Sequence, residues 1–430
     1  MKKAAFYTLG CKVNQYETEA MAELFEKAGY TITDFDTPAD VYVINTCSVT
    51  SMSDRKSRQI IRRAHKQNPS AIIAVAGCYS QTAPDKVAQI EGVNLVLGTQ
   101  DRRKIVELVE NISNTECINN VCDIMKNHTF EHLEIDNYSE RTRAYIKIQE
   151  GCNQFCSYCI IPYARGPIRS RDLADILDEA KKLVSKGFTE IVFAGIHVAS
   201  YGLDKKDGSS LAVLLNRLNE IDGIKRIRLS SIEPMTLDET FISQIKDCKK
   251  LCPHFHISLQ SGCDETLKRM NRKYTTAQYK SIVDGLRAHY PDTAITTDVM
   301  VGFPGETDEE FEKTLEFLNI VKFSDTHIFQ YSPRPGTPAA KYPNQIDPSV
   351  KEARSKQVEK IAEKSRSEFL QKHIGKTAEV LFEQRKDEFY EGKTDNYITV
   401  LIKSDEELSG KYKKVFLEKI IDNAIYGTIV

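Results

Sequence analysis

The chain has 430 residues, of which 41% are hydrophobic and 28% charged, and a formal net charge of −2. These values are typical of a globular protein with about three domains, and they exclude the strong overall positive field of many nucleic-acid-binding proteins. No stretch approaches the roughly 20 apolar residues of a membrane span. The apolar run at residues 4–9 is shorter than the core of a signal peptide. We therefore expect a cytoplasmic protein with no membrane partner.

The first hundred residues alternate between strand and helix patterns. Residues 14–30 predict an amphipathic helix, and strands are predicted at 4–9, 41–45, 71–76 and 93–97. Strands that alternate with helices imply an α/β domain with a doubly wound parallel sheet. We assign residues 1–112 to this domain and residues 113–140, which lack a clear period, to a linker.

Three cysteines each follow a predicted strand of this sheet: Cys11, Cys47 and Cys78. The carboxyl ends of parallel strands meet at one edge of a doubly wound sheet, where ligands bind. Gly10 and Gly77, beside two of these cysteines, let the backbone approach a bulky cofactor. The pattern predicts a site made of three thiolates. The alternative is three buried cysteines that behave as small apolar residues.

A second series of alternating elements begins at residue 144. Strands are predicted at 144–148, 190–194, 225–229, 254–259, 293–301 and 325–330, with amphipathic helices between them. Six such units predict a central partial (β/α)₆ barrel, and a long polar helix follows at about 348–373. Short strands and turns after residue 375 predict a small C-terminal β-barrel. The expected domains are 141–372 for the core with its trailing helix and 373–430 for the small barrel.

The strongest signal is a C-x₃-C-x₂-C run, made of Cys152, Cys156 and Cys159, directly after the first strand of the predicted (β/α)₆ barrel. The chain has 11 cysteines, which in a reducing compartment indicate metal binding or catalysis rather than disulfides. Three thiolates can hold three irons of a [4Fe–4S] cube, which normally takes four. The open iron can chelate the amino and carboxylate groups of an amino acid, including the methionine part of S-adenosylmethionine (SAM).

A zinc knuckle is the alternative for this loop, because zinc commonly takes two cysteine pairs. Cys248 and Cys252 form the candidate second pair. We otherwise treat these two, Cys263, and Cys117 and Cys122 in the linker as structural or incidental cysteines.

The run, with Tyr158 before its last cysteine and at the mouth of a partial barrel, resembles that of the radical SAM superfamily. The resemblance implies a reduced cluster, held by the three cysteines, that cleaves SAM to methionine and a 5′-deoxyadenosyl radical. Gly195 falls where the superfamily often has a Gly-Gly-Glu turn, although this chain lacks the glutamate. Polar residues follow other strands at the barrel mouth, where capping is the alternative role, as for Thr307. The expected cofactor-binding residues are Tyr158, Gly195, Glu233, Ser258, Gln260 and Asp298.

Two sets of three cysteines in this order resemble the methylthiotransferase family, and the likeness covers nearly the whole chain. The family implies two [4Fe–4S] clusters, with sulfur carried at Cys11, Cys47 and Cys78 and the radical generated at the central set. It also implies a C-terminal RNA-binding barrel of the TRAM type. The implied partners are the anticodon loop of tRNA, a sulfur donor and a reductant.

Three subfamilies modify threonylcarbamoyl-adenosine in tRNA, isopentenyl-adenosine in tRNA, or an aspartate of a ribosomal protein. The segments 9–17 and 159–166 most resemble the first subfamily. This resemblance implies methylthio transfer to C2 of N6-threonylcarbamoyladenosine at tRNA position 37. The other two substrates are alternatives, and a non-enzymatic RNA-binding protein with structural metal is a remote one.

Charge gives little independent support for RNA, because the predicted C-terminal barrel is balanced. The best basic stripe lies on the helix after Cys47, where a solvated face is the alternative to phosphate contact. It comprises Arg55, Lys56, Arg58, Arg62, Arg63 and Lys66. Arg165, Arg169 and Arg171 follow the central cysteines and are further candidates for phosphate contact.

Overall fold

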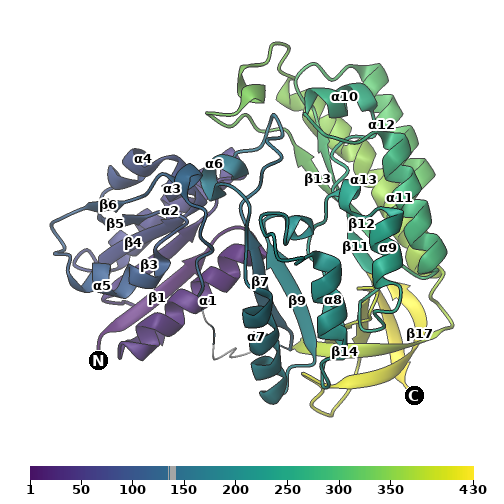
Figure 1. The fold of residues 1–430 in the computed structure, drawn as a ribbon, viewed down its shortest axis with the longest axis horizontal. Coiled ribbons are helices and arrows are strands. Elements are labelled where there is room, and N and C mark those ends of the chain that lie inside the picture. Colours follow the sequence, from purple (N-terminus) through teal and green to yellow (C-terminus); the bar gives the residue numbers. More distant parts are fainter. Residues whose placement is uncertain (134, 136–141) are drawn as a thin grey trace.

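The structure, a computed structural model, describes residues 1–133, 135 and 142–430. The expected boundary between the linker and the core, at residues 140–141, lies outside the described residues. Figure 1 shows an N-terminal sheet with its helices, a central curved array of strands and helices, and a C-terminal β-barrel beneath the core. Among the described residues, no helix has both the length and the apolar character needed to cross a membrane.

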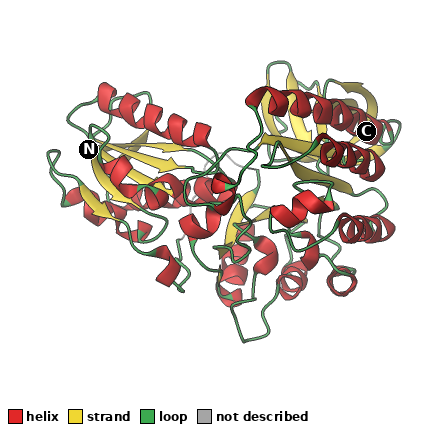
Figure 2. Cartoon of the chain, turned by 90° about the horizontal axis from the view of Figure 1, so that it is seen from above, coloured by secondary structure: helices red, strands yellow, loops and turns green. Residues whose placement is uncertain are grey.

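The N-terminal region is a parallel six-stranded sheet in the order β2-β1-β3-β4-β5-β6. Its strands are β1 (Lys3–Thr8), β2 (Thr31–Thr33), β3 (Val41–Thr46), β4 (Ile72–Gly77), β5 (Val93–Leu97) and β6 (Ile118–Asn120). Its helices are α1 (Lys12–Lys27), α2 (Ser51–Gln67), α3 (Cys78–Thr82), α4 (Pro84–Ala88) and α5 (Ile105–Glu110). Helices lie on both faces of this sheet (Figure 2). The expected doubly wound α/β domain is therefore confirmed.

Two separate apolar layers cover this sheet because its strands are buried on both faces. On one face, Met21 and Phe25 of α1 pack with Ile105 of α5. On the other, Ile61 and Ala64 of α2 pack against the opposite side of the same strands. Every residue of β3 is buried because helices cover both faces of the sheet.

The core contains six parallel strands that form an arc. They are β7 (Ala144–Glu150), β9 (Glu190–Gly195), β10 (Arg226–Arg228), β11 (His254–His256), β12 (Ala294–Val301) and β13 (Asp325–Gln330). The strands pair as β10-β9-β7, with the short antiparallel β8 (Arg169–Ser170) at the edge, and as β11-β12-β13. Single bridges, Ile227 to Leu251 and Ile232 to Ile257, join the two sheets. The expected partial (β/α)₆ barrel is confirmed.

Helices on the outer side of this arc bury one large apolar core with the strands. They are α7 (Leu173–Ser185), α8 (Leu211–Asn219), α9 (Glu239–Ile245), α11 (Thr276–His289) and α12 (Asp308–Val321), with short α6 (Ile161–Arg165) and α10 (Asp264–Arg269) in loops. Thr307 caps α12 in a reciprocal capping box with Glu310, so capping accounts for this threonine.

The C-terminal segment is a long helix, α13 (Pro348–Gln371), followed by a closed five-stranded barrel. The barrel order is β14-β15-β16-β18-β17. Its strands are β14 (Thr377–Lys386), β15 (Phe389–Lys393), β16 (Thr399–Ile402), β17 (Tyr412–Ile421) and β18 (Ala424–Ile429). The expected small β-barrel is confirmed.

Two arginines of β10 attach this barrel to the core through main-chain carbonyl groups. Arg226 donates to the carbonyls of Lys393 and Glu379 at 3.0 and 2.7 Å. Arg228 donates to those of Asp395 and Thr394, both at 2.7 Å. The barrel therefore sits at the amino-terminal end of the core strands, away from the cysteine loop that follows β7.

Sequence patterns missed two edge strands of the N-terminal sheet, β2 and β6. Each has only three residues, and β6 lies inside the segment expected to be linker. Three residues are too few to show a strand period, so only pairing with β1 and β5 identifies these strands.

Candidate active site

The three N-terminal cysteines meet at the carboxyl edge of the sheet. Cys11, Cys47 and Cys78 follow the adjacent strands β1, β3 and β4, and the Cys78 thiol interacts electrostatically with the other two. Gly10 has φ +103, and a Cβ there would lie 2.9 Å from Cys47 Cβ and 3.1 Å from its Sγ. A side chain at Gly10 would therefore push into the space beside the Cys47 thiol.

The three central cysteines lie on the loop between β7 and α6. Cys159 interacts electrostatically with both Cys152 and Cys156, and its N–H donates to the Cys156 carbonyl at 2.9 Å. Burial raises the pKa of Cys152 to about 11 and that of Cys159 to about 12. Such thiols lose their protons only if a positive centre stabilises the thiolates, as bound iron does.

The spacing of the thiols bears on the zinc alternative. Within the described ranges, no three His, Cys, Asp or Glu side chains converge closely enough to hold one metal ion. A [4Fe–4S] cube binds each thiolate at a different iron, so it does not require three ligands to converge on one metal ion. Cys248, the proposed second zinc partner, is buried with its Sγ directed at the Leu215 carbonyl, 3.6 Å away.

Arg165 of α6 links the two cysteine sets. Its Nε–H donates to Cys78 Sγ at 3.2 Å, although it lies six residues after Cys159 in the chain. Its Nη1–H groups donate to Glu17 of α1 at 2.6 Å and to Glu150 of β7 at 3.1 Å. The loop of the central cysteines is therefore fixed directly to a cysteine of the N-terminal sheet.

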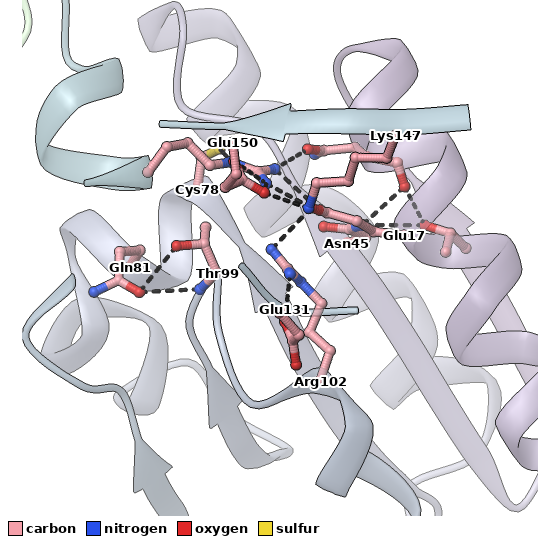
Figure 3. A network of polar contacts seen from close by, with 12 residues as sticks. Glu17, Asn45, Cys78, Gln81, Thr99, Arg102, Glu131, Lys147 and Glu150 are labelled. Carbon is pink, nitrogen blue, oxygen red and sulfur yellow. Dashed lines mark hydrogen bonds and ion pairs between the residues drawn. The ribbon is translucent and has the colours of Figure 1, made fainter. Parts of the chain in front are cut away.

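A buried network of charges surrounds this contact (Figure 3). Arg102 pairs with Glu17 at 3.1 Å and with Glu131 at 2.8 Å, and Lys147 pairs with Glu17 at 2.7 Å. Burial alone would raise the pKa of the Glu17 carboxyl, but Arg102 and Arg165 hold it well below its usual range. The interface between the N-terminal region and the core is thus held by compensated buried charges.

Arg272 also contacts the central set of cysteines. It donates to Cys156 Sγ at 3.3 Å, to Glu233 at 2.9 Å and to the Ser258 carbonyl at 3.1 Å. Glu233 and Ser258, both expected near the cofactor, therefore hold this arginine against a cysteine. The sequence did not predict that Glu233 and Ser258 would act through Arg272.

A cavity of about 190 Å³ opens beside the central cysteines. Cys159, Tyr158, Gln260 and Asp298 line it together with residues 49–50, which follow Cys47 in the N-terminal region. Asp298 also accepts a hydrogen bond from Ser258 at 3.3 Å. Three of the residues expected to bind the cofactor thus share one cavity, between the two cysteine sets.

The turn after β9 contains Gly195 and His197. A Cβ on Gly195 would lie 2.9 Å from Val198 Cγ2, so the turn has no room for a side chain at that position. Both ring nitrogens of His197 are buried and, among the described residues, have no hydrogen-bond partner. Burial lowers the pKa of His197 to about 4, so its ring is neutral at pH 7.

Three arginines expected as candidates for phosphate contact are not available for it. Arg165, Arg169 and Arg171 are at most 4% exposed because they bind groups inside the protein, as Arg171 does Glu179. The phosphate interpretation of these residues is wrong. The stripe on α2 remains accessible: Arg55, Lys56, Arg62, Arg63 and Lys66 are exposed, and Arg58 is half-buried beside Tyr79.

The most informative residues that sequence reasoning missed are Glu17, Arg102, Lys147, His197 and Arg272. The sequence around these residues gives little indication of their role, because single charged residues in helices and strands usually face solvent. Glu17 is the clearest case, since it lies on α1 among residues expected to be polar and surface-exposed.

Solved structures with low sequence identity share this fold. The radical SAM methyltransferase TsrM from Kitasatospora setae superposes with a TM-score of 0.58 at 15% identity, over 79% of this chain and 77% of that one. The cobalamin-dependent SAM radical enzyme OxsB has a TM-score of 0.51 at 12% identity, over 86% and 56%.

Sequence comparisons divide the chain into two matched regions. Residues 146–318 match the radical SAM superfamily, and residues 3–98 match the uncharacterized protein family UPF0004. The first match covers the core strands and the central cysteines, and the second covers the sheet with Cys11, Cys47 and Cys78.

Curated relatives extend over nearly the whole length. The threonylcarbamoyladenosine tRNA methylthiotransferase MtaB of Bacillus subtilis is 45% identical, over 97% of this chain and 94% of the relative. Its Aquifex aeolicus counterpart is 39% identical over 96% and 100%. The tRNA-2-methylthio-N(6)-dimethylallyladenosine synthase of Acetivibrio thermocellus is 36% identical over 98% and 90%. The chain belongs to the radical SAM methylthiotransferase family.

Proposed function

We propose that this chain adds a methylthio group to C2 of N6-threonylcarbamoyladenosine at position 37 of tRNA, with SAM as cofactor. The observation that carries the proposal is the meeting of two cysteine sets at one interface, where Arg165 contacts Cys78. A sulfur source and a radical source must reach the same carbon atom, and residues from both regions line the cavity beside Cys159. Relatives at 39–45% identity support the choice of base.

We assign one [4Fe–4S] cluster to each cysteine set. Cys152, Cys156 and Cys159 would hold the radical cluster, and Cys11, Cys47 and Cys78 the auxiliary one. Three thiols per set leave one iron of each cube open for a ligand. With SAM bound, the radical cluster supplies the carbon radical needed to remove hydrogen from an inert C–H bond.

The remaining site residues would bind SAM and orient the groups around it. Tyr158, Gln260 and Asp298 would contact SAM in the cavity that they line. Arg272, held by Glu233 and Ser258, donates a hydrogen bond to a sulfur ligand, one of the factors that set the potential of a cluster. The unpartnered nitrogens of His197, in the turn of Gly195, offer an acceptor to a cofactor amino group.

The substrate RNA would contact both ends of the molecule. The C-terminal barrel, residues 373–430, would act as a TRAM-like RNA-binding domain, and the arginines of α2 would bind phosphates near the anticodon loop. Phe329 is 43% exposed at the cavity beside Cys159 and offers an aromatic face on which a base can stack.

The domain at residues 1–112 would carry the auxiliary cluster, and the domain at residues 141–372 would carry the radical cluster. We place the protein in the cytoplasm, with a sulfur donor and a reductant as further partners.

Nucleoside mass spectrometry of tRNA from a deletion strain tests the activity. We expect the methylthiolated base to disappear and N6-threonylcarbamoyladenosine to accumulate, with recovery by the wild-type gene and none by a Cys159→Ala variant. Loss of the methylthio group from isopentenyl-adenosine would instead support a second substrate, which relatives at 36–38% identity favour. Unchanged tRNA with loss of a methylthio group from a ribosomal protein would contradict the tRNA proposal.

Iron content tests the two-cluster assignment separately. Anaerobic iron and sulfide quantitation with EPR should give about eight irons per chain, falling to about four in the Cys152/Cys156/Cys159 triple alanine variant, as two cubes require. Zinc, or a wild-type protein with about four irons, would contradict the auxiliary cluster.

A further inference from the structure

The loop of the central cysteines borders two separate spaces. Tyr158 and Cys159 line the cavity of about 190 Å³ described above. Phe155 and Ser157, on either side of Cys156, line a second recess of about 500 Å³ together with residues of α10 and of the loops after β12 and β13. The recess is therefore one residue along the chain from a proposed cluster ligand, and it shares no lining residue with the cavity.

Phe155 has an unusual backbone conformation at this recess. Its φ is +48, in the left-handed region that few residues other than glycine adopt, and such strain is common at functional sites. The side-chain amide of Asn271 donates to the Phe155 carbonyl at 2.9 Å, which holds the backbone in this conformation. The Phe155 ring is 39% exposed and lies 5.9 Å from the equally exposed ring of Tyr163. The cysteine loop thus presents an aromatic surface to solvent beside its own cluster site.

Ser157 connects the cysteine loop to the wall of the recess. Its hydroxyl donates to the Arg269 carbonyl at 2.8 Å, and its N–H donates to the Met270 carbonyl at 3.0 Å. Its own carbonyl accepts from the Ala339 N–H at 2.8 Å. An electron that arrives at this wall therefore has a short path of covalent and hydrogen bonds to Cys156.

The recess carries positive charge. Lys268 lines it, is exposed, and makes no ion pair with any residue that the structure describes. Lys273 is exposed as well, and its ammonium donates to the side-chain oxygen of the lining residue Asn271 at 2.6 Å, without a carboxylate partner in the described part of the chain. Arg269 also lines the recess, but Glu310 neutralises it at 2.8 Å. None of the described residues that line the recess is acidic, so two uncompensated ammonium groups favour an acidic partner.

We propose that this recess is the docking surface for a small acidic protein that delivers electrons to the radical cluster. The inference rests on the cluster assigned to the central cysteines and not on the choice of tRNA base. One electron leaves the reduced carrier, which is oxidised by one electron, and reduces the cluster by one electron; no atom is transferred and no bond breaks. Complexes between redox proteins are typically small and transient, so a compact recess with a charged rim is sufficient. Docking there leaves the cavity beside Cys159 free for SAM and the base.

Binding of an acidic carrier tests this surface without turnover. The probes are a bacterial flavodoxin and a bacterial ferredoxin of negative net charge, each fluorescently labelled, oxidised, and mixed with the full-length reconstituted protein. Anaerobic anisotropy should show that the wild type binds a carrier at low salt and that the affinity falls as the ionic strength rises. The double variant Lys268→Glu with Lys273→Glu should bind that carrier roughly tenfold more weakly.

A matched double variant controls for the change in net charge. Lys360→Glu with Lys364→Glu reverses two exposed lysines of α13 and should bind the carrier as the wild type does. A second measurement follows the cluster itself. By stopped-flow absorbance at low salt, the reduced carrier should reduce the cluster of the Lys268/Lys273 variant roughly tenfold more slowly than that of the wild type. Dithionite, which needs no protein docking, should give both proteins the same EPR signal.

Three results would overturn the inference. A wild type that binds neither carrier at low salt lacks this docking surface. Equal affinities of the Lys268/Lys273 variant and the wild type would place the carrier elsewhere. Weaker binding of an anticodon stem-loop by that variant, with unchanged binding of the carrier, would assign the two lysines to RNA phosphates. Each of these results leaves the proposed function intact, because the tRNA of the deletion strain tests that function separately.

Discussion

Arg165 lies 87 residues after Cys78 in the chain, yet its Nε–H donates to the Cys78 sulfur at 3.2 Å. The same guanidinium binds Glu17 and Glu150, so one side chain ties the loop of the central cysteines, the first helix and the first core strand together. The distance between the two cysteine sets thus depends on a side chain that is fully buried.

Replacing Arg165 by methionine should destabilise the apo protein by about 3–5 kcal/mol, because it leaves the buried carboxylates of Glu17 and Glu150 short of a partner. Urea unfolding followed by circular dichroism measures the change. Arg103→Met, which removes an exposed arginine next to the network, is the matched control and should change the stability by less than about 0.5 kcal/mol. A similar small effect at Arg165 would show that the network does not stabilise the interface.

The two cysteine sets should fail in different ways when mutated. Cys156→Ala should abolish SAM cleavage, because the proposed radical cluster loses a ligand. Cys47→Ala should still cleave SAM but should form no methylthiolated base, because only the proposed sulfur-carrying site is damaged. Chromatographic quantitation of 5′-deoxyadenosine and of the modified nucleoside checks both. Methylthiolation by Cys47→Ala at the wild-type rate would contradict the proposal that the two cysteine sets have separate roles.

His197→Ala should weaken SAM binding by roughly tenfold, the effect of losing one hydrogen bond to a charged group. The fold should persist because, among the described residues, no protein group bonds to the ring nitrogens of His197. Equilibrium dialysis with labelled SAM and the reconstituted protein measures the affinity. His289→Ala, on the distant end of α11, serves as the control. Equal affinities in His197→Ala and the wild type would remove this residue from the cofactor site.

The attachment of the C-terminal barrel should weaken in mild acid because of His373. Its Nδ1–H donates to the Phe369 carbonyl at 2.9 Å, and its Nε2 accepts from Asn396 at 3.0 Å, so the bonded form is neutral. Burial lowers the pKa of His373 below 6.5 in the folded protein. The unfolded chain therefore takes up a proton first as the pH falls, and stability is lost below about pH 6.5.

Thermal unfolding between pH 7.5 and 5.5 measures this dependence. His373→Gln should unfold at a lower temperature at pH 7.5 but lose less stability on acidification than the wild type. If the two proteins show parallel pH profiles, another group is responsible for the acid sensitivity.

Much of the architecture was predictable because local patterns express it. The helix at 308–321 has a capping box and an apolar face, and the structure has α12 at Asp308–Val321. Cysteines after successive parallel strands must share an edge, so the grouping of Cys11, Cys47 and Cys78 followed from topology alone.

The rest depends on contacts between distant segments. An arginine such as Arg165 is usually expected at the protein surface. Its burial is explained by the carboxylates of Glu17 and Glu150, with which it pairs. The three-residue strands β2 and β6 exist because an existing sheet edge pairs with them.

The way in which Arg226 and Arg228 hold the C-terminal barrel has an evolutionary consequence. Their acceptors are main-chain carbonyls, a group that every amino acid possesses. Substitutions in the β15–β16 turn can therefore accumulate without breaking the joint, as long as the backbone keeps its path. The barrel can therefore diversify its outer surface while it remains attached to the same core.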